Sequence, residues 1–154
     1  GRGGARRGKT PHVDMLIIVA YLPQDPSSDY GRNHTRKVLH WISDQIDMLP
    51  ARCAPVILCD GNGHVGLRKG PGGQWAIIPS PAVGTHNGAQ ENHNGSMLRQ
   101  MCERHHLLMS NTFYSNPPTF FHKDGTGSSR VDYIIAPQSL RHAMSCSSVW
   151  TSTG

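Results

Sequence analysis

An acid and an amide follow the most apolar run of the chain, and together they offer the clearest chemistry in the sequence. Residues 56–59 are Val-Ile-Leu-Cys and lead directly into Asp60-Gly61-Asn62, with further glycines at 63 and 66. A carboxylate can take a proton from a reacting group, and an amide can hold that group. Because Asp60 and Asn62 are two residues apart, an extended backbone would place them on one face. We therefore take both as candidate catalytic residues.

Two other interpretations of this stretch stay open on the residues alone. Asp-Gly and Asn-Gly are common turn signals, so the segment could simply connect two strands. The spacing Asp60-x-Asn62 also opens a calcium loop. That loop needs glycine at its sixth place and glutamate at its twelfth, where this chain has Val65 and Pro71.

The elements that must position these residues are indicated by apolar patterns. A β-branched apolar run over residues 12–22 ends at Pro23, which predicts a buried strand with Tyr21 at its carboxyl end. Apolar residues at helical spacing predict a helix over 34–49, and residues 55–59 predict the next strand. Strand, helix, strand is the pattern of an α/β protein, in which ligands bind beyond the carboxyl ends of the strands. The alternative, which position alone favours, is that Tyr21 is a core tyrosine with a bonded hydroxyl.

The second half of the chain carries another acid in an apolar setting. Residues 66–95 are rich in glycine and proline and predict a long loop, in which 75–78 could form a minor strand. Asn94 or Ser96 is expected to cap a following helix, and 107–111 to form a strand. Residues 117–136 are typical of a hairpin. Alternation in 131–135 places Asp132 on the face opposite Tyr133, so Asp132 meets either solvent or a polar site.

Composition limits the remaining choices. The 154 residues suit one domain or a piece of a larger one, and no apolar run approaches the roughly 20 residues of a membrane span. The net charge is +5, but residues 1–9 carry four of the fifteen basic side chains and no acid. Residues 1–11 therefore predict a disordered basic tail, and the rest has no strong basic excess. The four cysteines lack paired spacing, and although His86 with His93, or Cys102 with His105 and His106, could be ligands, a zinc site or disulfide framework is not expected.

The motifs, taken in order, resemble the endonuclease/exonuclease/phosphatase superfamily, and most closely the endonuclease domains of LINE-type (non-LTR) retrotransposons. The likeness covers about residues 13–137. Its parts are the tyrosine strand at 19–23, the Gly-Asp-Phe-Asn-like segment at 59–62, the Asn-x-Asn-Gly segment at 92–95, the strand at 108–112 that begins with leucine and ends in Asn-Thr, Thr119-Phe120, and Arg130-Val131-Asp132-Tyr133-Ile134.

This resemblance implies a partial four-layer, DNase I-like α/β sandwich, with mixed sheets and covering helices, over residues 12–137, and a C-terminal remainder at 138–154. It implies Mg²⁺-dependent (or Mn²⁺-dependent) hydrolysis of DNA phosphodiesters by nicking, in the nucleus if the chain is a retroelement product. Asp60 would orient the attacking water and act as a weak metal ligand, Asn62 and Tyr21 would hold the phosphate or the water, and Asp132 would orient a histidine. Substrate contacts would come from Thr119, Asn94 and Arg130. Tyr21, Asp60, Asn62 and Asp132 are thus expected to converge at one rim of a sheet.

The chain also departs from the family pattern. Cys59 and Gly61 stand where the family has glycine and phenylalanine. The family's asparagine and metal-binding glutamate should precede residue 13, and its Ser-Asp-His motif should follow residue 137, but neither has a counterpart among the 154 residues. We therefore expect weak or no activity from this chain, which reads as a fragment. A phosphatase or phosphodiesterase of the same superfamily, acting on lipid or inositol phosphates, and a non-catalytic nucleic-acid-binding remnant are the alternatives.

Overall fold

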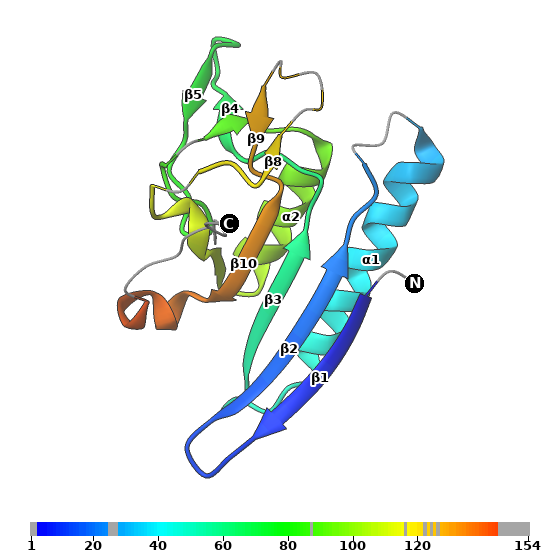
Figure 1. Ribbon diagram of the computed structural model, residues 1–154, viewed down its shortest axis with the longest axis vertical. Coiled ribbons are helices and arrows are strands. Elements are labelled where there is room, and N and C mark those ends of the chain that lie inside the picture. Colours follow the sequence, from blue (N-terminus) through cyan, green and yellow to red (C-terminus); the bar gives the residue numbers. More distant parts are fainter. Residues whose placement is uncertain are drawn as a thin grey trace.

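A computed structural model describes residues 3–24, 28–86, 88–115, 117–121, 123, 125 and 127–144 of the chain. The protein is an α/β protein with mixed sheets (Figure 1). The larger sheet has the strand order β1-β2-β3-β10-β7, and its strands are β1 (Gly3–Lys9), β2 (Asp14–Tyr21), β3 (Ala54–Asp60), β7 (Leu107–Met109) and β10 (Asp132–Pro137). A three-stranded sheet contains β4 (Gly66–Lys69), β5 (Trp75–Ile77) and β6 (Ala89–Gln90), and β8 (Phe120–Phe121) pairs with β9 (Ser128–Ser129).

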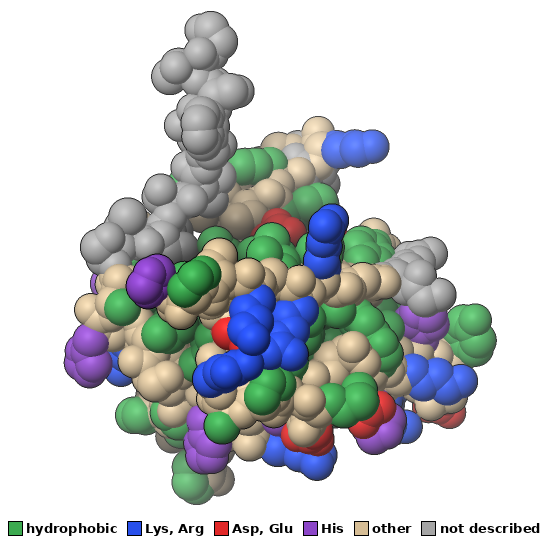
Figure 2. All heavy atoms as spheres, turned by 90° about the horizontal axis from the view of Figure 1, so that it is seen from below, with side chains coloured by type: hydrophobic (Ala, Val, Ile, Leu, Met, Phe, Trp, Pro, Cys, Tyr) green, Lys and Arg blue, Asp and Glu red, His purple; other side chains and the backbone are tan. Residues whose placement is uncertain are grey.

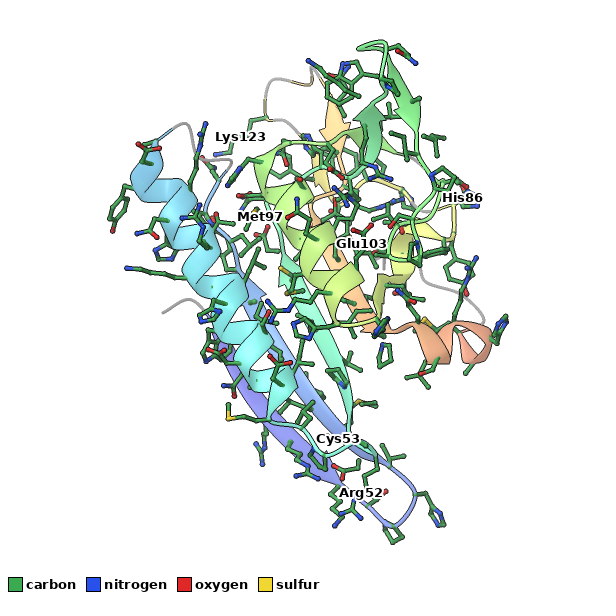
Figure 3. All side chains as sticks on the ribbon, turned by 180° about the vertical axis from the view of Figure 1, so that it is seen from behind. Arg52, Cys53, His86, Met97, Glu103 and Lys123 are labelled. Atoms are coloured by element: carbon green, nitrogen blue, oxygen red, sulfur yellow. The ribbon has the colours of Figure 1, made fainter. Side chains whose placement is uncertain are left out.

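Two helices cover one face of the larger sheet. They are α1 (Asp29–Asp47) and α2 (His93–Arg104), which lie side by side in front of the sheet when it is seen from behind (Figure 3). Helix α1 begins earlier than its apolar pattern predicts, because the Ser28 hydroxyl accepts the Gly31 N–H and caps a first turn that is exposed. The short 3-10 helices are Ser110–Thr112 and Gln138–Ala143.

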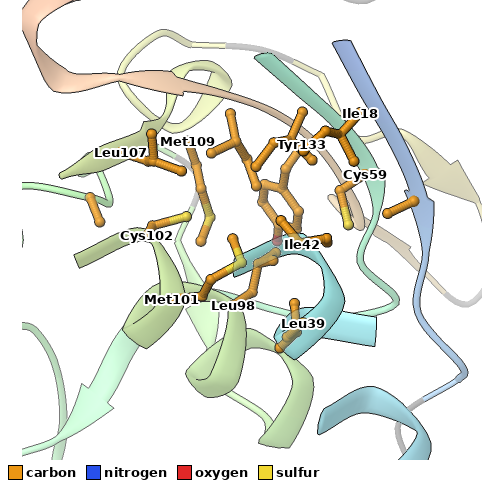
Figure 4. Packing of buried hydrophobic residues seen from close by; sticks show 14 of the residues in the cluster. Ile18, Leu39, Ile42, Cys59, Leu98, Met101, Cys102, Leu107, Met109 and Tyr133 are labelled. Atoms are coloured by element: carbon orange, nitrogen blue, oxygen red, sulfur yellow. The ribbon is translucent and has the colours of Figure 1, made fainter. Parts of the chain in front are cut away.

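The hydrophobic core lies between this sheet face and the helices (Figure 4). Ile18, Ile57 and Ile135 come from three neighbouring strands, and Ile42 and Leu98 come from the two helices; all five are fully buried. Burying a side chain of this size contributes about 1.5–3 kcal/mol, so this contact holds the central strands β2, β3 and β10 in place.

The other face of the larger sheet is exposed, although its strands are apolar there as well. Ile17 and Val19 of β2, Leu58 of β3 and Ile134 of β10 are 41–54% exposed. The register puts Val19 beside Leu58 and Leu58 beside Ile134, so these side chains form a continuous stripe. Parallel strand pairs such as β2 and β3 are usually covered on both faces. The described residues therefore supply one helix layer and one sheet layer of the expected sandwich.

The prediction of a disordered tail is wrong for Gly3–Lys9, which forms the edge strand β1 and pairs antiparallel with β2 along its whole length. Pairing by backbone hydrogen bonds needs no apolar pattern, and every residue of β1 is exposed. The side chain of Arg7 also binds Asp14 on the neighbouring strand. Residues 1–2 and 145–154, the latter within the predicted C-terminal remainder, lie outside the described residues.

Three further predictions about elements need correction. Residues 66–95 are not one long loop, because β4, β5 and β6 form a small sheet there. Strand β7 ends at Met109, and residues 110–112 turn into a 3-10 helix. The hairpin predicted over 117–136 is confirmed for β8 and β9, which pair antiparallel. It does not extend to the segment that contains Asp132, which pairs with β3 and β7 in the larger sheet. Local turn signals could not reveal these long-range partners. No helix among the described residues is long and apolar enough to cross a membrane.

Candidate functional site

Tyr21, Asp60 and Asp132 form a row across three neighbouring strands. Tyr21 ends β2 and Asp60 ends the parallel strand β3, and the two are register partners. Asp132 begins the antiparallel strand β10 and is the register partner of Asp60. Partners in a ladder point to the same face, so all three side chains lie on the exposed face of the sheet, next to the apolar stripe. Each is half-buried.

The two carboxylates of this row concentrate negative charge. Directly opposed residues on antiparallel strands have Cβ atoms about 5 Å apart, and two like charges at that distance destabilise each other. The pKa of Asp60 is raised, first by burial and further by the charge of Asp132, while a hydrogen bond from Asn62 opposes the rise. No salt bridge to either carboxylate is found among the described residues. The pair is therefore suited to receive a cation.

Asn62 lies beside the row but not in the extended conformation that the sequence suggests. Its φ is 40°, in the left-handed region, so Asp60 and Asn62 do not share a strand face. The Asn62 N–H donates to Asp60 Oδ1 at 3.2 Å, and the side-chain Nδ2 donates to the Leu22 carbonyl at 2.8 Å. Asn62 thus ties the exits of β2 and β3 together and orients the Asp60 carboxylate. No residue that the structure describes donates a hydrogen bond to its Oδ1, which can therefore accept one.

Asn94 lies behind the row, and its side chain hydrogen-bonds several segments of the chain at once. Its side chain is fully buried, with Nδ2 at 2.7 Å from the Pro23 carbonyl and at 3.4 and 3.3 Å from the carbonyls of Gly61 and Asn62. Its Oδ1 accepts the Thr35 hydroxyl of α1 at 3.0 Å. Because no surface of Asn94 is exposed, this conformation offers a substrate no contact with it, and the substrate role of Asn94 stays a prediction. Asn94 positions the segments that carry Tyr21 and Asp60.

The helix cap is Asn92 instead of Asn94 or Ser96. The Asn92 side chain accepts the N–H groups of Gly95 at 2.9 Å and His64 at 3.0 Å. This draws the 61–64 loop onto the first turn of α2 so closely that a Cβ on Gly95 would lie 1.8 Å from the His64 carbonyl oxygen. Residue type does not separate Asn92 from the expected caps Asn94 and Ser96, and only the tertiary contact with His64 distinguishes it.

Thr119 forms hydrogen bonds with the backbone at the start of β10. Its hydroxyl accepts the backbone N–H groups of Val131 at 3.1 Å and Asp132 at 3.2 Å. Asn111 supports the same strand from the other side, because its Nδ2 donates to the Asp132 carbonyl at 2.8 Å. Thr119 is half-buried and thus reaches the site mainly by fixing the backbone of Asp132. In the sequence Asn111 belongs to the Asn-Thr motif at 108–112 but is not among the predicted site residues; its signal is a polar residue directly after a buried strand.

Arg130 lies inside the protein. The residue is 8% exposed, Nη1 donates to the His86 carbonyl at 3.0 Å, and burial lowers the pKa of the guanidinium. The prediction that Arg130 binds substrate therefore does not fit this conformation. Sequence reasoning also missed Tyr133, whose hydroxyl lies 2.7 Å from the Gly63 carbonyl and 3.1 Å from the Arg130 carbonyl. Tyr133 anchors the loop that follows Asp60 from the core side.

No family model and no curated protein matches this chain. A function is therefore inferred from the chemistry of the side chains in the row.

The row is better suited to a divalent cation that prefers oxygen ligands, such as Mg²⁺, than to zinc. Among the described residues, no three histidine, cysteine, aspartate or glutamate side chains come together as metal ligands. Zinc sites need at least three such protein ligands. Mg²⁺ is often held by one or two carboxylates, with water and substrate phosphate completing its shell. Asp60 and Asp132 are side by side and form no salt bridge with any residue that the structure describes, so they meet that requirement.

Proposed function

We propose that the protein hydrolyses phosphodiester bonds of DNA with the help of Mg²⁺ or Mn²⁺, as a nicking endonuclease of the endonuclease/exonuclease/phosphatase type. The observation that carries the proposal is the cross-strand pair of Asp60 and Asp132, with Tyr21 on the next strand. Two acids and a phenol at one edge of a sheet are the groups that metal-assisted phosphoryl chemistry uses. The motif order in the sequence supports the same class.

Each side chain of the row has a separate task in this proposal. Asp60 and Asp132 would hold the metal ion, and Asp60 would accept a proton from the attacking water. When bound, the ion supplies charge stabilisation for the phosphate oxygens. Tyr21 would donate a hydrogen bond from its hydroxyl to a phosphate oxygen. Asn62 would accept a hydrogen bond from the attacking water through Oδ1, because its Nδ2 is held by the Leu22 carbonyl.

We expect the rate to be low. The family's metal-binding glutamate and its histidine have no counterpart among the 154 residues. Electrostatic groups of this kind contribute about 10²–10³-fold each to the rate. A retroelement product of this type would act in the nucleus.

Supercoiled plasmid incubated with the full chain and Mg²⁺ or Mn²⁺ tests the proposal. We expect slow conversion to the nicked form that stops in EDTA and is lost in Asp60→Ala. Asp44→Ala is the matched control, because Asp44 is an exposed acid on α1. Nicking that persists in Asp60→Ala would overturn the proposal, since it would not come from this site. Complete absence of nicking with either metal would also overturn it, and DNA binding without turnover would then favour a non-catalytic remnant.

A further inference from the structure

The hairpin of β4 and β5 presents an aromatic and basic face that the row of acids does not use. In its register Lys69 pairs with Trp75, and Leu67 pairs with Ile77, so these four side chains share one face. Trp75 is 39% exposed and Ile77 48% exposed, although both are large apolar residues. The Lys69 ammonium lies 5.6 Å from the centre of the Trp75 ring, within the range of a cation–π contact.

Hydrogen bonds hold the hairpin in place. Some join its own backbone, and others come from Arg68, on the face opposite Trp75. Arg68 Nη2 donates to the carbonyls of Ile78 and Pro79 at 3.0 and 3.3 Å, which anchors the base of β5. In the turn, the Gly70 N–H donates to the Gln74 carbonyl at 2.9 Å. The turn also needs Gly73, whose φ of 80° is strained for other residues. Trp75 is therefore displayed on an ordered element.

The hairpin lies at the functional end of the molecule. Figure 1 shows β4 and β5 projecting beyond the end of the larger sheet at which β3 finishes and β10 begins. That is the end at which Asp60 and Asp132 lie. Lys123, in the turn between β8 and β9, is at the same end (Figure 3).

The charge of this region favours a polyanion. The thirty residues between Asp60 and Glu91 contain two basic side chains, Arg68 and Lys69, and no aspartate or glutamate. Glu91 is neutralised by Arg99, whose Nε donates to it at 2.9 Å. A bound anionic strand would thus meet no acid on the hairpin itself.

We propose that the face formed by Leu67, Lys69, Trp75 and Ile77 binds an unpaired segment of a nucleic acid strand. Trp75 stacks on a base and Lys69 contacts the neighbouring phosphate. Because the Lys69 ammonium lies over one face of the indole, the base would stack on the opposite ring face, and the ammonium would lie on the side of the neighbouring phosphate. An acidic peptide would use the charge of Lys69 but would leave the ring face without a planar partner. The inference rests on the proposed function for the choice of DNA, and it assigns a contact outside the row of acids.

Fluorescence anisotropy of a short labelled oligo(dT) with the full chain in EDTA tests this contact without cleavage. We expect Trp75→Ala to weaken binding about tenfold or more, and Trp75→Phe to retain most of it. Lys69→Gln should weaken binding and lower the slope of log K against log salt by about 0.7. Tyr30→Ala is the matched control, because Tyr30 is an 84% exposed ring at the start of α1. We expect no change in this variant.

Three results would overturn the inference: no binding of oligo(dT) by the unaltered chain, equal binding by Trp75→Ala, or equally strong competition by polyglutamate. The outcome is separable from that of the nicking test. Loss of binding in Trp75→Ala together with no metal-dependent nicking would retain the hairpin contact and reject the nuclease. Nicking that depends on Asp60, with oligo(dT) binding unaffected by Trp75→Ala, would do the reverse.

Discussion

Two aspartates of the larger sheet, one near each end, show opposite uses of a carboxylate. Asp14 at the start of β2 accepts hydrogen bonds from Arg7 at 2.7 and 2.5 Å and from Arg52 at 3.1 Å, and the Arg7 bonds hold its pKa well below the ordinary value. Figure 2, which views this end from below, shows several side chains in the colour of Lys and Arg gathered around an acidic one. Asp60 at the end of β3 faces a second acid, and its pKa is raised. Asp14 therefore stabilises the fold, whereas Asp60 keeps its charge available at a cost to stability.

The two ends also differ in what holds the chain together. The end with Asp14 relies on an ion cluster, and Arg7 and Arg52 are both partly exposed there. The end with Asp60 relies on hydrogen bonds from neutral side chains, chiefly Asn94, Asn62 and Tyr133. Neutral hydrogen bonds do not interfere with the charge of the row. Salt, pH and mutation should therefore affect the two ends differently.

The largest effect on stability should follow removal of the Asn94 side chain, which is buried and uncharged. Asn94→Ala leaves the Pro23 carbonyl and the Thr35 hydroxyl without their buried partner. We expect the free energy of unfolding to fall by about 3 kcal/mol, since each buried unsatisfied group costs about 1–3 kcal/mol. Urea unfolding, followed by circular dichroism, measures the change. Asn33→Ala, at an exposed position of α1, is the control and should shift stability by less than about 0.5 kcal/mol.

If the stability lost in Asn94→Ala depended on salt, this would contradict the interpretation that Asn94 acts through uncharged hydrogen bonds. Within the described part of the chain, the hydrogen-bond partners of Asn94 are all uncharged. The difference between the variant and the unaltered chain should accordingly be the same at low salt and in 1 M NaCl, where charge interactions are screened within about 3 Å.

Asp14→Asn should have a smaller effect that does depend on salt and pH. The folded-state pKa of Asp14 is lowered, so the carboxylate contributes stability above its ordinary pKa of about 4 and loses that contribution as the pH falls below it. The variant should therefore be less stable at pH 7, and the difference should shrink on acidification and in high salt. Thermal unfolding between pH 7 and pH 2 measures this. A difference that is constant over this range would show that the Arg7 and Arg52 contacts do not stabilise the charged form.

The sequence predicted those features of the site that depend on local periodicity. The apolar runs located β2 and β3, and Pro23 placed Tyr21 at the end of its strand, as the structure has it. Alternation placed Asp132 with Ile134 on the face opposite Tyr133, and this is confirmed by the exposure of Ile134 and the burial of Tyr133. A two-residue period determines which face a side chain takes whatever its partner strand is.

The features that depend on long-range contacts were not predictable in this way. Gly3–Lys9 has no apolar pattern because its strand is stabilised by pairing with β2. Asn94 and Arg130 are polar residues in segments that resemble substrate-binding motifs, yet tertiary packing buries both of them. The left-handed conformation of Asn62 follows from the turn after β3 and not from its residue type alone. The buried, hydrogen-bonded roles of Asn94 and Arg130 can be recognised only when the positions of their partner carbonyls are known.

The smallest effect should be a gain of stability at the row itself. Because burial and Asp132 raise the pKa of Asp60, folding disfavours its charged form, and the resulting loss of stability grows as the pH rises through the interval between the unfolded and folded pKa values. Asp60→Asn should therefore raise the free energy of unfolding at pH 7 in EDTA by a few tenths of a kcal/mol, as expected for removal of a like-charge cross-strand pair. The gain should vanish near pH 3, where both proteins are neutral at this position. In a double-mutant cycle with Asp132→Asn, the second substitution should add less than it does alone, since the repulsion has already been removed. Mg²⁺ should stabilise the unaltered chain more than Asp60→Asn, and equal stabilisation of both would show that the row does not bind the ion.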